Sequence, residues 1–392
     1  MPSVISRCGV VRHRSPPATW ATAIACFVAA FVTVRVEGQS RSSQALAAKI
    51  EAHLAPLVAR SGFAGVVLVG RGNGVLFERA YGMANVELAA PNRTDTRFRI
   101  HSITKQFTAM AVVLLANRGA LSLDVSVRTY LPELPEAWHS VTIFELMTHT
   151  SGLPQLENQW FETFQRHAVV TELDNLELLV PKIRNDTLAT ALRGKFSYNN
   201  FGYDLLACVV ERVSGDRFAE FVRKNIFEPA SMKDAGFDAR ADVANGMYVA
   251  SAVVPRLASG YNGSPEKLQV AFPLMFGSAG AGGMYATARD LFSYDKALNA
   301  RRLVGADLER ENLTRAFKIS DKANYGYGWI IRRPSDSVYY LEHSGGNNGY
   351  TADYARYPLD GVCVIVLINR GGVDATEVRR AIARMVLGTK YD

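Results

Sequence analysis

The segment Phe98-Arg99-Ile100-His101-Ser102-Ile103-Thr104-Lys105, continued by QFTAMAVVLLANRG at residues 106–119, contains the junction on which the fold prediction depends. Its first three residues are typical of a short strand, and apolar residues at helical spacing follow Ser102. Gly119 is a common signal for the C-terminus of a helix. The sequence therefore predicts a strand that leads directly into a buried helix beginning near Ser102.

Strand-like segments lie near both ends of the chain. A predicted helix at Ala45 to Ala59 precedes a predicted β-hairpin with strands at Ala64 to Gly70 and Val75 to Tyr81. An amphipathic helix at Ala375 to Leu387 follows the last strands. The C-terminal strands are predicted at Tyr327 to Arg332, Val338 to Glu342, Thr351 to Tyr357 and Val362 to Asn369.

The stretch from about residue 121 to residue 288 is predicted to be mostly helical. Strands that come from both ends of the chain, with helices between them, indicate an α+β fold. We expect an antiparallel β-sheet flanked by the terminal helices, with a mostly helical lobe inserted into it. A site would then lie between these two parts.

The first 38 residues have the pattern of a targeting segment. Arg7, Arg12 and Arg14 precede an uncharged run of 17 residues, Ala18 to Val34. This order predicts a signal peptide at residues 1–38 and a secreted or periplasmic protein. Because the run approaches the length of a membrane-spanning helix, an uncleaved anchor at residues 18–34, with the protein facing outside the cytoplasm, stays open as an alternative.

Composition excludes several classes of protein. With 48% hydrophobic and 21% charged residues, the chain is neither disordered nor fibrous. Removing residues 1–38 lowers the formal net charge from +7 to 40 − 36 = +4, and the remaining cations are scattered, which argues against nucleic-acid binding. No spacing of His and Cys fits a metal site, and no cofactor is expected. Cys208 and Cys363 are either two buried free thiols or, alternatively, one disulfide.

Ser102 and Lys105 could act as a nucleophile and its base. Residues at i and i+3 of a helix share a face, and a serine hydroxyl needs a base to become an effective nucleophile. The same Ser-x-x-Lys pattern also occurs at Ser264 to Lys267, in a predicted loop, and at Ser293 to Lys296, inside a predicted helix. Neither copy lies at a helix N-terminus, where the helix dipole favours a developing negative charge.

Two later motifs give the Ser102 copy its context. Tyr198-Asn199-Asn200 precedes an apolar helix, and His343-Ser344-Gly345-Gly346 ends a strand. In this order, Ser-x-x-Lys, Tyr-x-Asn and His-x-Gly resemble the signature of the class C β-lactamase and penicillin-binding serine hydrolase family. Further segments that resemble the family scaffold are LMTHTSGL at residues 146–153, GAGGMY at residues 280–285 and YGYGW at residues 325–329.

This resemblance covers residues 45–388 and implies a β-lactamase/transpeptidase-like fold. It also implies that Ser102 is the nucleophile and that Lys105 and Tyr198 take its proton. Asn200 would contact a substrate carbonyl or position Lys105, although Asn at this place could instead cap a helix.

The resemblance further implies that the strand ending at Gly346 forms one side of the site. Backbone N–H groups of Ser102 and Gly346 would stabilise an oxyanion, and Gly345 would allow the strand backbone to come close. His343 replaces the Lys of true class C β-lactamases, and a neutral imidazole attracts a substrate carboxylate weakly. His149, a possible rival base, is interpreted as a residue that stabilises a turn.

The prediction is a serine hydrolase that forms an acyl-enzyme. Its partner would be a small-molecule or peptide substrate, with esters and D-amino-acid peptide or amide bonds ranked before β-lactams. A β-lactamase and a non-catalytic binding protein with the same fold are the alternatives.

Overall fold

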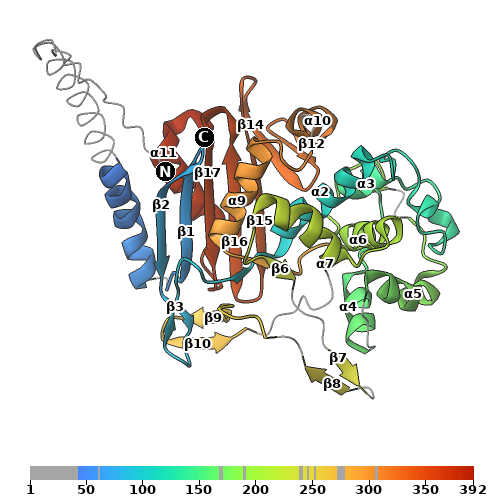
Figure 1. Cartoon of the computed structure of the whole chain (residues 1–392), viewed down its shortest axis with the longest axis horizontal. Helices are drawn as coiled ribbons and strands as arrows, with labels where there is room; N and C mark the ends of the chain where they lie inside the picture. Colours follow the sequence, from blue (N-terminus) through green and yellow to red (C-terminus); the bar gives the residue numbers. More distant parts are fainter. Residues whose placement is uncertain are drawn as a thin grey trace, which may run out of the picture. The chain divides into compact units, whose positions relative to one another are not determined.

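An eight-stranded antiparallel sheet joins the two ends of the chain in the computed structural model, which describes residues 43–60, 62–166, 171–188, 191–237, 242–244, 247–250, 253–271, 279–304 and 308–392 (Figure 1). The strand order is β12-β13-β14-β15-β16-β17-β1-β2. The first strand pairs with the last, Gly65 lying opposite Ile368. The strands are β1 (Gly65–Arg71), β2 (Gly74–Tyr81), β12 (Phe317–Ser320), β13 (Ala323–Gly326), β14 (Trp329–Ser335), β15 (Val338–Asn347), β16 (Tyr350–Tyr357) and β17 (Val362–Ile368).

Helices cover both faces of this sheet. On β16, side chains alternate between the faces: Asp353 bonds Arg379 of α11 (Ala375–Leu387), whereas Tyr354 bonds Asp295 of α9 (Ala288–Asn299). Residues 43–60 are helical, as predicted. The α+β fold with an antiparallel sheet is confirmed.

A buried network of charges holds α11 against the sheet. The Arg379 side chain is 1% exposed and donates from Nε to Asp353 at 2.9 Å and from Nη1 to the Tyr357 hydroxyl at 3.2 Å. It also pairs with Glu342 of β15. Since each partner satisfies buried polar atoms of the others, the network fixes how α11 lies on β15 and β16.

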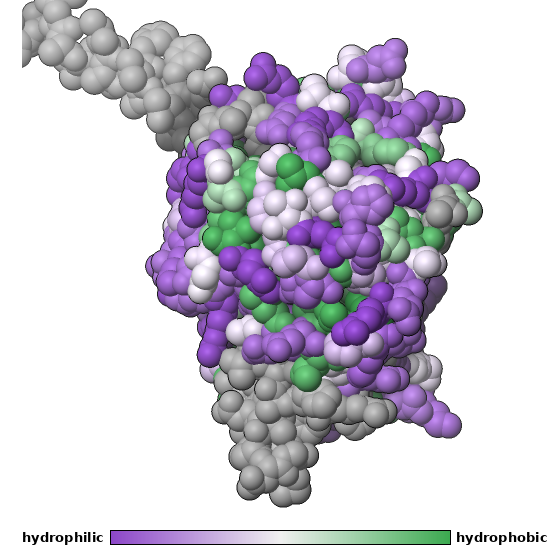
Figure 2. All heavy atoms as spheres, turned by 90° about the vertical axis from the view of Figure 1, so that its right-hand side faces the viewer, coloured by the Kyte–Doolittle hydropathy of each residue, from purple (hydrophilic) through white to green (hydrophobic). Residues whose placement is uncertain are grey.

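The middle of the chain contains most of the remaining helices. They are α3 (Ile143–Met147), α4 (Glu157–Arg166), α5 (Glu172–Ile183), α6 (Asn200–Ser214), α7 (Phe218–Val222) and α8 (Glu228–Ala230). The face that carries α3 to α5 is mainly hydrophilic, with small apolar areas between the polar side chains (Figure 2).

After α8 the structure differs from the mostly helical prediction. Residues 236–286 contain short strands: β6 (Gly236–Phe237), β7 (Asp242–Ala244), β8 (Met247–Ala250), β9 (Tyr261–Ser264), β10 (Lys267–Val270) and β11 (Met284–Ala286). Strand β11 pairs with both β6 and β5 (Phe98–Arg99). Strands this short carry too few residues for a period of two to be recognised in the sequence.

Two further predictions concern the cysteines and the N-terminus. Cys208 and Cys363 are both buried and free, so they form no disulfide. The predicted signal peptide or anchor at residues 1–38 lies outside the described residues. Within the part of the chain that the structure describes, none of the helices has the length and apolar character needed to cross a membrane.

Candidate active site

Ser102 lies in a single 3-10 turn, η1 (His101–Ile103), that leads directly into α2 (Thr104–Asn117). Strand β5, immediately before it, is held by β11. The predicted strand-to-helix junction is therefore present, and it places Ser102 at the N-terminal end of α2. Backbone N–H groups at such an end favour negative charge.

Lys105 is fully buried and lies one turn after Ser102. Its Nζ is 3.1 Å from Ser102 Oγ, 2.8 Å from Asn200 Oδ1 and 2.8 Å from the Ala281 carbonyl oxygen. Lys105 is thus surrounded by three oxygen atoms and has no carboxylate within hydrogen-bond distance among the described residues. Three of the predicted site residues, Ser102, Lys105 and Asn200, meet at this amine.

The number of acceptors around Lys105 bears on its chemistry. The carbonyl oxygens of Asn200 and Ala281 can only accept hydrogen bonds. A neutral amine has two N–H donors and one lone pair, so it can donate to both carbonyls while its lone pair accepts the Ser102 hydroxyl proton. An ammonium group would instead donate one N–H to each of the three oxygens, so the role of Lys105 as a base for Ser102 stays a prediction.

Tyr198 lies on the open side of this cluster, with its side chain 37% exposed. The centre of its ring is 4.9 Å from Lys105 Nζ, and the ring packs on His149 at 4.4 Å between centroids. Gln155 donates to the Tyr198 backbone carbonyl at 2.9 Å. The structure therefore places the Tyr198 ring beside Lys105.

The helix cap that the sequence left open for Asn200 is instead made by its neighbour. Asn199 is the N-cap of α6, and its Oδ1 accepts from Gly202 N–H at 2.9 Å. This leaves the Asn200 side chain free to bond Lys105, while its Nδ2 lies 3.4 Å from Glu157 Oε1.

His149 is enclosed by aromatic rings and is 1% exposed. Its Nδ1 accepts from Asn199 N–H at 3.1 Å, and its carbonyl accepts from Ser197 N–H at 2.8 Å. Burial, with the nearby charge of Lys105, holds the pKa of His149 well below its usual value. His149 therefore ties the turn after α3 to the start of α6, which agrees with its interpretation as a turn residue.

The Ala281 carbonyl belongs to a segment that is packed against two helices. The Gly280 carbonyl accepts from Thr108 Oγ1 at 2.6 Å, and the Ala281 N–H donates to Asp204 at 3.1 Å. A Cβ at Gly280 would lie 2.2 Å from the Tyr203 carbonyl oxygen, so only glycine fits there. The sequence singled out this glycine-rich run as scaffold but gave no sign of the carbonyl that contacts Lys105.

His343 lies on β15, is 3% exposed and has both ring nitrogens engaged. Its Nδ1 is 2.6 Å from the Ser344 carbonyl oxygen, which can only accept, so Nδ1 carries the proton and Nε2 accepts from the Tyr325 hydroxyl at 3.0 Å. Burial lowers the pKa of His343 to about 3. A neutral imidazole held in this way supports the strand, and contact of its nitrogens with a substrate stays a prediction.

Gly345 and Gly346 form the end of β15 that lies against Ser102. A Cβ at Gly345 would lie 2.0 Å from the Ile100 carbonyl oxygen and 3.2 Å from Ser102 N. Gly346 is exposed, and a Cβ there would meet nothing closer than the Tyr350 carbonyl oxygen at 3.8 Å. The strand edge therefore depends on Gly345 for its approach to Ser102.

These two glycines form a matched pair for mutation. Gly345→Ala is expected to push β15 away from Ser102 and to lower kcat/KM by about a hundredfold, because a displacement of about 1 Å at a catalytic centre has that effect. Gly346→Ala should stay within a fewfold of wild type. Hydrolysis of an activated ester measures both, and equal losses in the two variants would contradict the argument.

His101, which the sequence analysis did not single out, directly precedes Ser102. It adopts a left-handed backbone conformation, with φ +45°, and is 2% exposed. Burial, with the charges of Arg99 and Lys105, lowers its pKa to about 3. Three buried neutral histidines, His101, His149 and His343, therefore surround the Ser102 and Lys105 pair.

Acid is expected to destabilise the protein through these histidines. Between pH 6.5 and about 3 an unfolded histidine binds a proton that folded His343 does not, so stability falls as pH falls, by about 1.4 kcal/mol per pH unit for each such residue. When the free energy of unfolding is measured with urea between pH 6 and 4.5, its slope against pH should be smaller by this amount in His343→Gln than in wild type. The same substitution at the exposed His139 is the control and should leave the slope as in wild type. An unchanged slope in His343→Gln would refute the assignment of His343 as a buried neutral imidazole.

The other two Ser-x-x-Lys copies lie elsewhere. Ser264 and Lys267 face each other across the β9–β10 hairpin, and Lys267 is exposed. Ser293 and Lys296 lie inside α9. Both copies come after the Tyr198-x-Asn200 motif in the sequence, which agrees with their interpretation as chance matches.

Comparison with known proteins places the chain in a family. The Beta-lactamase family matches residues 50–387. Penicillin-binding protein 4* of Bacillus subtilis is 28% identical over 84% of this chain and 74% of its own length. Esterase EstB of Burkholderia gladioli is 29% identical over 67% of this chain and 72% of its own.

A solved structure agrees with this assignment. The penicillin-binding protein from Bacillus halodurans has a TM-score of 0.71 and 29% identity, and the match covers 85% of this chain and all of that one. The match to the family extends over nearly the whole described chain. The chain therefore belongs to the β-lactamase family of serine hydrolases.

Proposed function

We propose that this protein hydrolyses esters or D-amino-acid peptide and amide bonds through an acyl-enzyme on Ser102. The observation that carries the proposal is the contact of 3.1 Å between Ser102 Oγ and a buried lysine whose other two neighbours are carbonyl oxygens. That arrangement leaves one position of the amine for the serine proton.

In the first half of the reaction, Ser102 Oγ attacks the substrate carbonyl carbon while its proton passes to Lys105 Nζ. The new bond converts the carbonyl oxygen into an oxyanion, which the N–H groups of Ser102 and Gly346 stabilise. Collapse breaks the bond to the leaving alcohol or amine, which receives a proton through Tyr198 and Lys105. Tyr198 suits this step because its exposed ring lies next to the Lys105 amine.

In the second half, a water molecule attacks the acyl carbon. Its proton passes to Tyr198 and Lys105, the ester bond to Ser102 Oγ breaks, and Oγ regains a proton as the carboxylic acid leaves. Tyr198 and Lys105 thus accept a proton in one step and donate it in the next, in both halves of the reaction. All bonds and protons balance without a cofactor.

The substrate class follows from the end of β15. A lysine at position 343 would offer a cation to a substrate carboxylate, whereas His343 is buried and neutral there. This favours esters and D-amino-acid substrates before β-lactams. One relative is an esterase by name, and another is a penicillin-binding protein. Action outside the cytoplasm on such substrates agrees with the targeting pattern of residues 1–38.

A substrate panel tests the proposal. p-Nitrophenyl esters of short acids, D-alanyl peptides and nitrocefin are compared by kcat/KM, and we expect an ester or a D-peptide to exceed nitrocefin by at least about tenfold, or about 1.4 kcal/mol of transition-state stabilisation. Faster turnover of nitrocefin would identify a β-lactamase instead. Absence of turnover, together with no mass gain after a fluorophosphonate, would identify a binding protein.

A further inference from the structure

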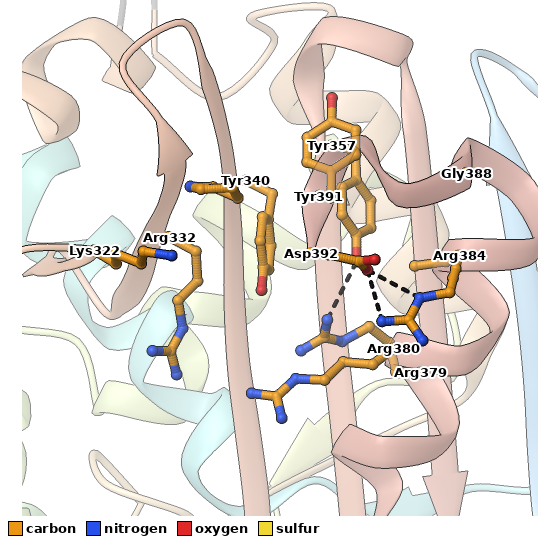
Figure 3. A pocket seen from close by; sticks show the side chains of 12 residues that line it. Lys322, Arg332, Tyr340, Tyr357, Arg379, Arg380, Arg384, Gly388, Tyr391 and Asp392 are labelled. Carbon is orange, nitrogen blue, oxygen red and sulfur yellow. Dashed lines mark hydrogen bonds and ion pairs between the residues drawn. The ribbon is translucent and has the colours of Figure 1, made fainter.

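A cavity of about 340 Å³ lies on the α11 side of the sheet (Figure 3). It is formed by the ends of β14, β15 and β16, by α11 and by the C-terminal turn η6 (Gly388–Tyr391). The lining residues are Lys322, Arg332, Pro334, Tyr340, Tyr357, Arg379, Arg380, Ala383, Arg384, Gly388, Tyr391 and Asp392. Five of these twelve side chains are cationic, and one is acidic.

This basic cavity is separate from the Ser102 site. Alternate residues of a strand point to opposite faces of the sheet. Glu342 points toward α11, where it pairs with Arg379, whereas Gly345 packs against Ile100 on the other face. Gly346, at the candidate active site, lies six residues after Tyr340, in the cavity, which corresponds to about 20 Å of strand.

Four of the five cations, all except Lys322, have an acidic partner. Arg379 is buried against Asp353 and Glu342. Arg384 holds the Asp392 carboxylate, with Nε at 3.0 Å and Nη2 at 2.9 Å from the same oxygen. This second pair shows that the cavity accommodates a carboxylate group against its arginines.

Three of the five cations, Lys322, Arg332 and Arg380, keep hydrogen-bond donors. Arg332 contacts Glu342 through Nε, and Arg380 contacts Glu377 through Nη1. The Lys322 ammonium has no hydrogen-bond or ion-pair partner among the described residues. A guanidinium carries five N–H donors in a fixed plane, so both arginines retain N–H groups for a ligand. In Figure 3, Lys322 and Arg332 lie on one side of Tyr340, and Arg380 and Arg384 lie on the other.

Tyrosine rings make the wall between these cations rigid. Tyr340 stacks on Tyr357 with 5.1 Å between ring centroids, and Tyr391 meets Tyr357 edge-on at 4.8 Å. Arg379 lies over the Tyr340 ring at 5.6 Å. Because these rings are fixed by packing, they lose little conformational entropy when a ligand enters.

The geometry points to a binding site for a small molecule that carries a phosphate group. The unsatisfied groups are donors on cations, so the ligand has to bring negatively charged acceptor oxygens. Arginine forks match the paired oxygens of phosphate, and lysine adds a point charge. A phosphate monoester offers three terminal oxygens to the free N–H groups of Lys322, Arg332 and Arg380, whereas a carboxylate offers two. A volume of about 340 Å³ is at the lower end of small-molecule sites.

Calorimetric titration of the whole protein at constant ionic strength tests this site, with inorganic phosphate, glycerol 1-phosphate and citrate as probes. We expect both phosphate probes to bind. The double variant Lys322→Gln/Arg380→Gln should weaken the binding of both by at least about tenfold, because it removes two charge-assisted contacts. Lys267→Gln, an exposed lysine on β10, is the matched control and should bind as wild type does.

Three results would overturn the proposal. The first is the absence of heat with either phosphate probe up to about 10 mM, which corresponds to a binding free energy weaker than about 3 kcal/mol. The second is equal affinity of wild type and the double variant for the phosphate probes. The third is tighter binding of citrate than of phosphate. Ester hydrolysis by the double variant should equal that of wild type, because the cavity lies on the other face of the sheet. This also verifies that the variant is folded.

Discussion

Ser102→Ala is expected to lose hydrolysis of every ester and peptide in the panel, with kcat lower by on the order of 10⁴-fold, because no other group can form the acyl-enzyme. The variant should also gain no mass from a fluorophosphonate. Its fold should persist, since the Ser102 side chain is only partly buried and Lys105 keeps two other acceptors.

The chain offers a matched control for this experiment. Ser264 is followed by Lys267 in the same Ser-x-x-Lys pattern, on an exposed hairpin. Ser264→Ala is expected to hydrolyse and to be labelled as wild type. Labelling that persists in Ser102→Ala, or disappears in Ser264→Ala, would assign the nucleophile elsewhere.

Lys105→Arg is expected to be inactive although it retains a positive charge and hydrogen-bond donors. A guanidinium does not give up its proton in proteins, so it cannot take one from Ser102. Loss of a general base lowers kcat by about 10²–10⁴-fold. The steady-state kcat and the rate of fluorophosphonate labelling should both decrease in this variant.

A second variant separates this effect from a packing defect. Lys105→Met fills similar space and removes both charge and donors, which leaves the buried carbonyls of Asn200 and Ala281 without their partner and destabilises the fold by about 1–3 kcal/mol. Both variants should be equally inactive, with thermal unfolding recorded for each. An Arg variant with a tenth or more of the wild-type kcat would show that Lys105 acts through charge alone.

The sequence predicted those parts of the fold whose signals are local. The helix Ala375–Leu387 has the predicted bounds, and the hairpin of β1 and β2 follows from apolar runs that flank a turn. Six short strands between residues 236 and 286 escaped prediction. Partners far away in the sequence, such as β5 for β11, stabilise several of them, and a short window of sequence does not show such partners.

The active site divides in the same way. Ser102, Lys105, Tyr198 and Asn200 could be named because their side-chain types suit the chemistry and form a recognisable order. The Ala281 carbonyl could not, because a backbone oxygen leaves no mark in the sequence. The Tyr325 hydroxyl that orients His343 was also missed, since only the pairing of β13, β14 and β15 brings it there.

The pairing of β1 with β17 determines when during synthesis the main sheet can be completed. Gly65 lies opposite Ile368, which the ribosome adds 368 − 65 = 303 residues later. Until then one edge of β1 has no partner, and the hairpin of β1 and β2 cannot join strands β12 to β16. A nascent chain of this topology therefore keeps its main sheet in two parts until β17 has been made.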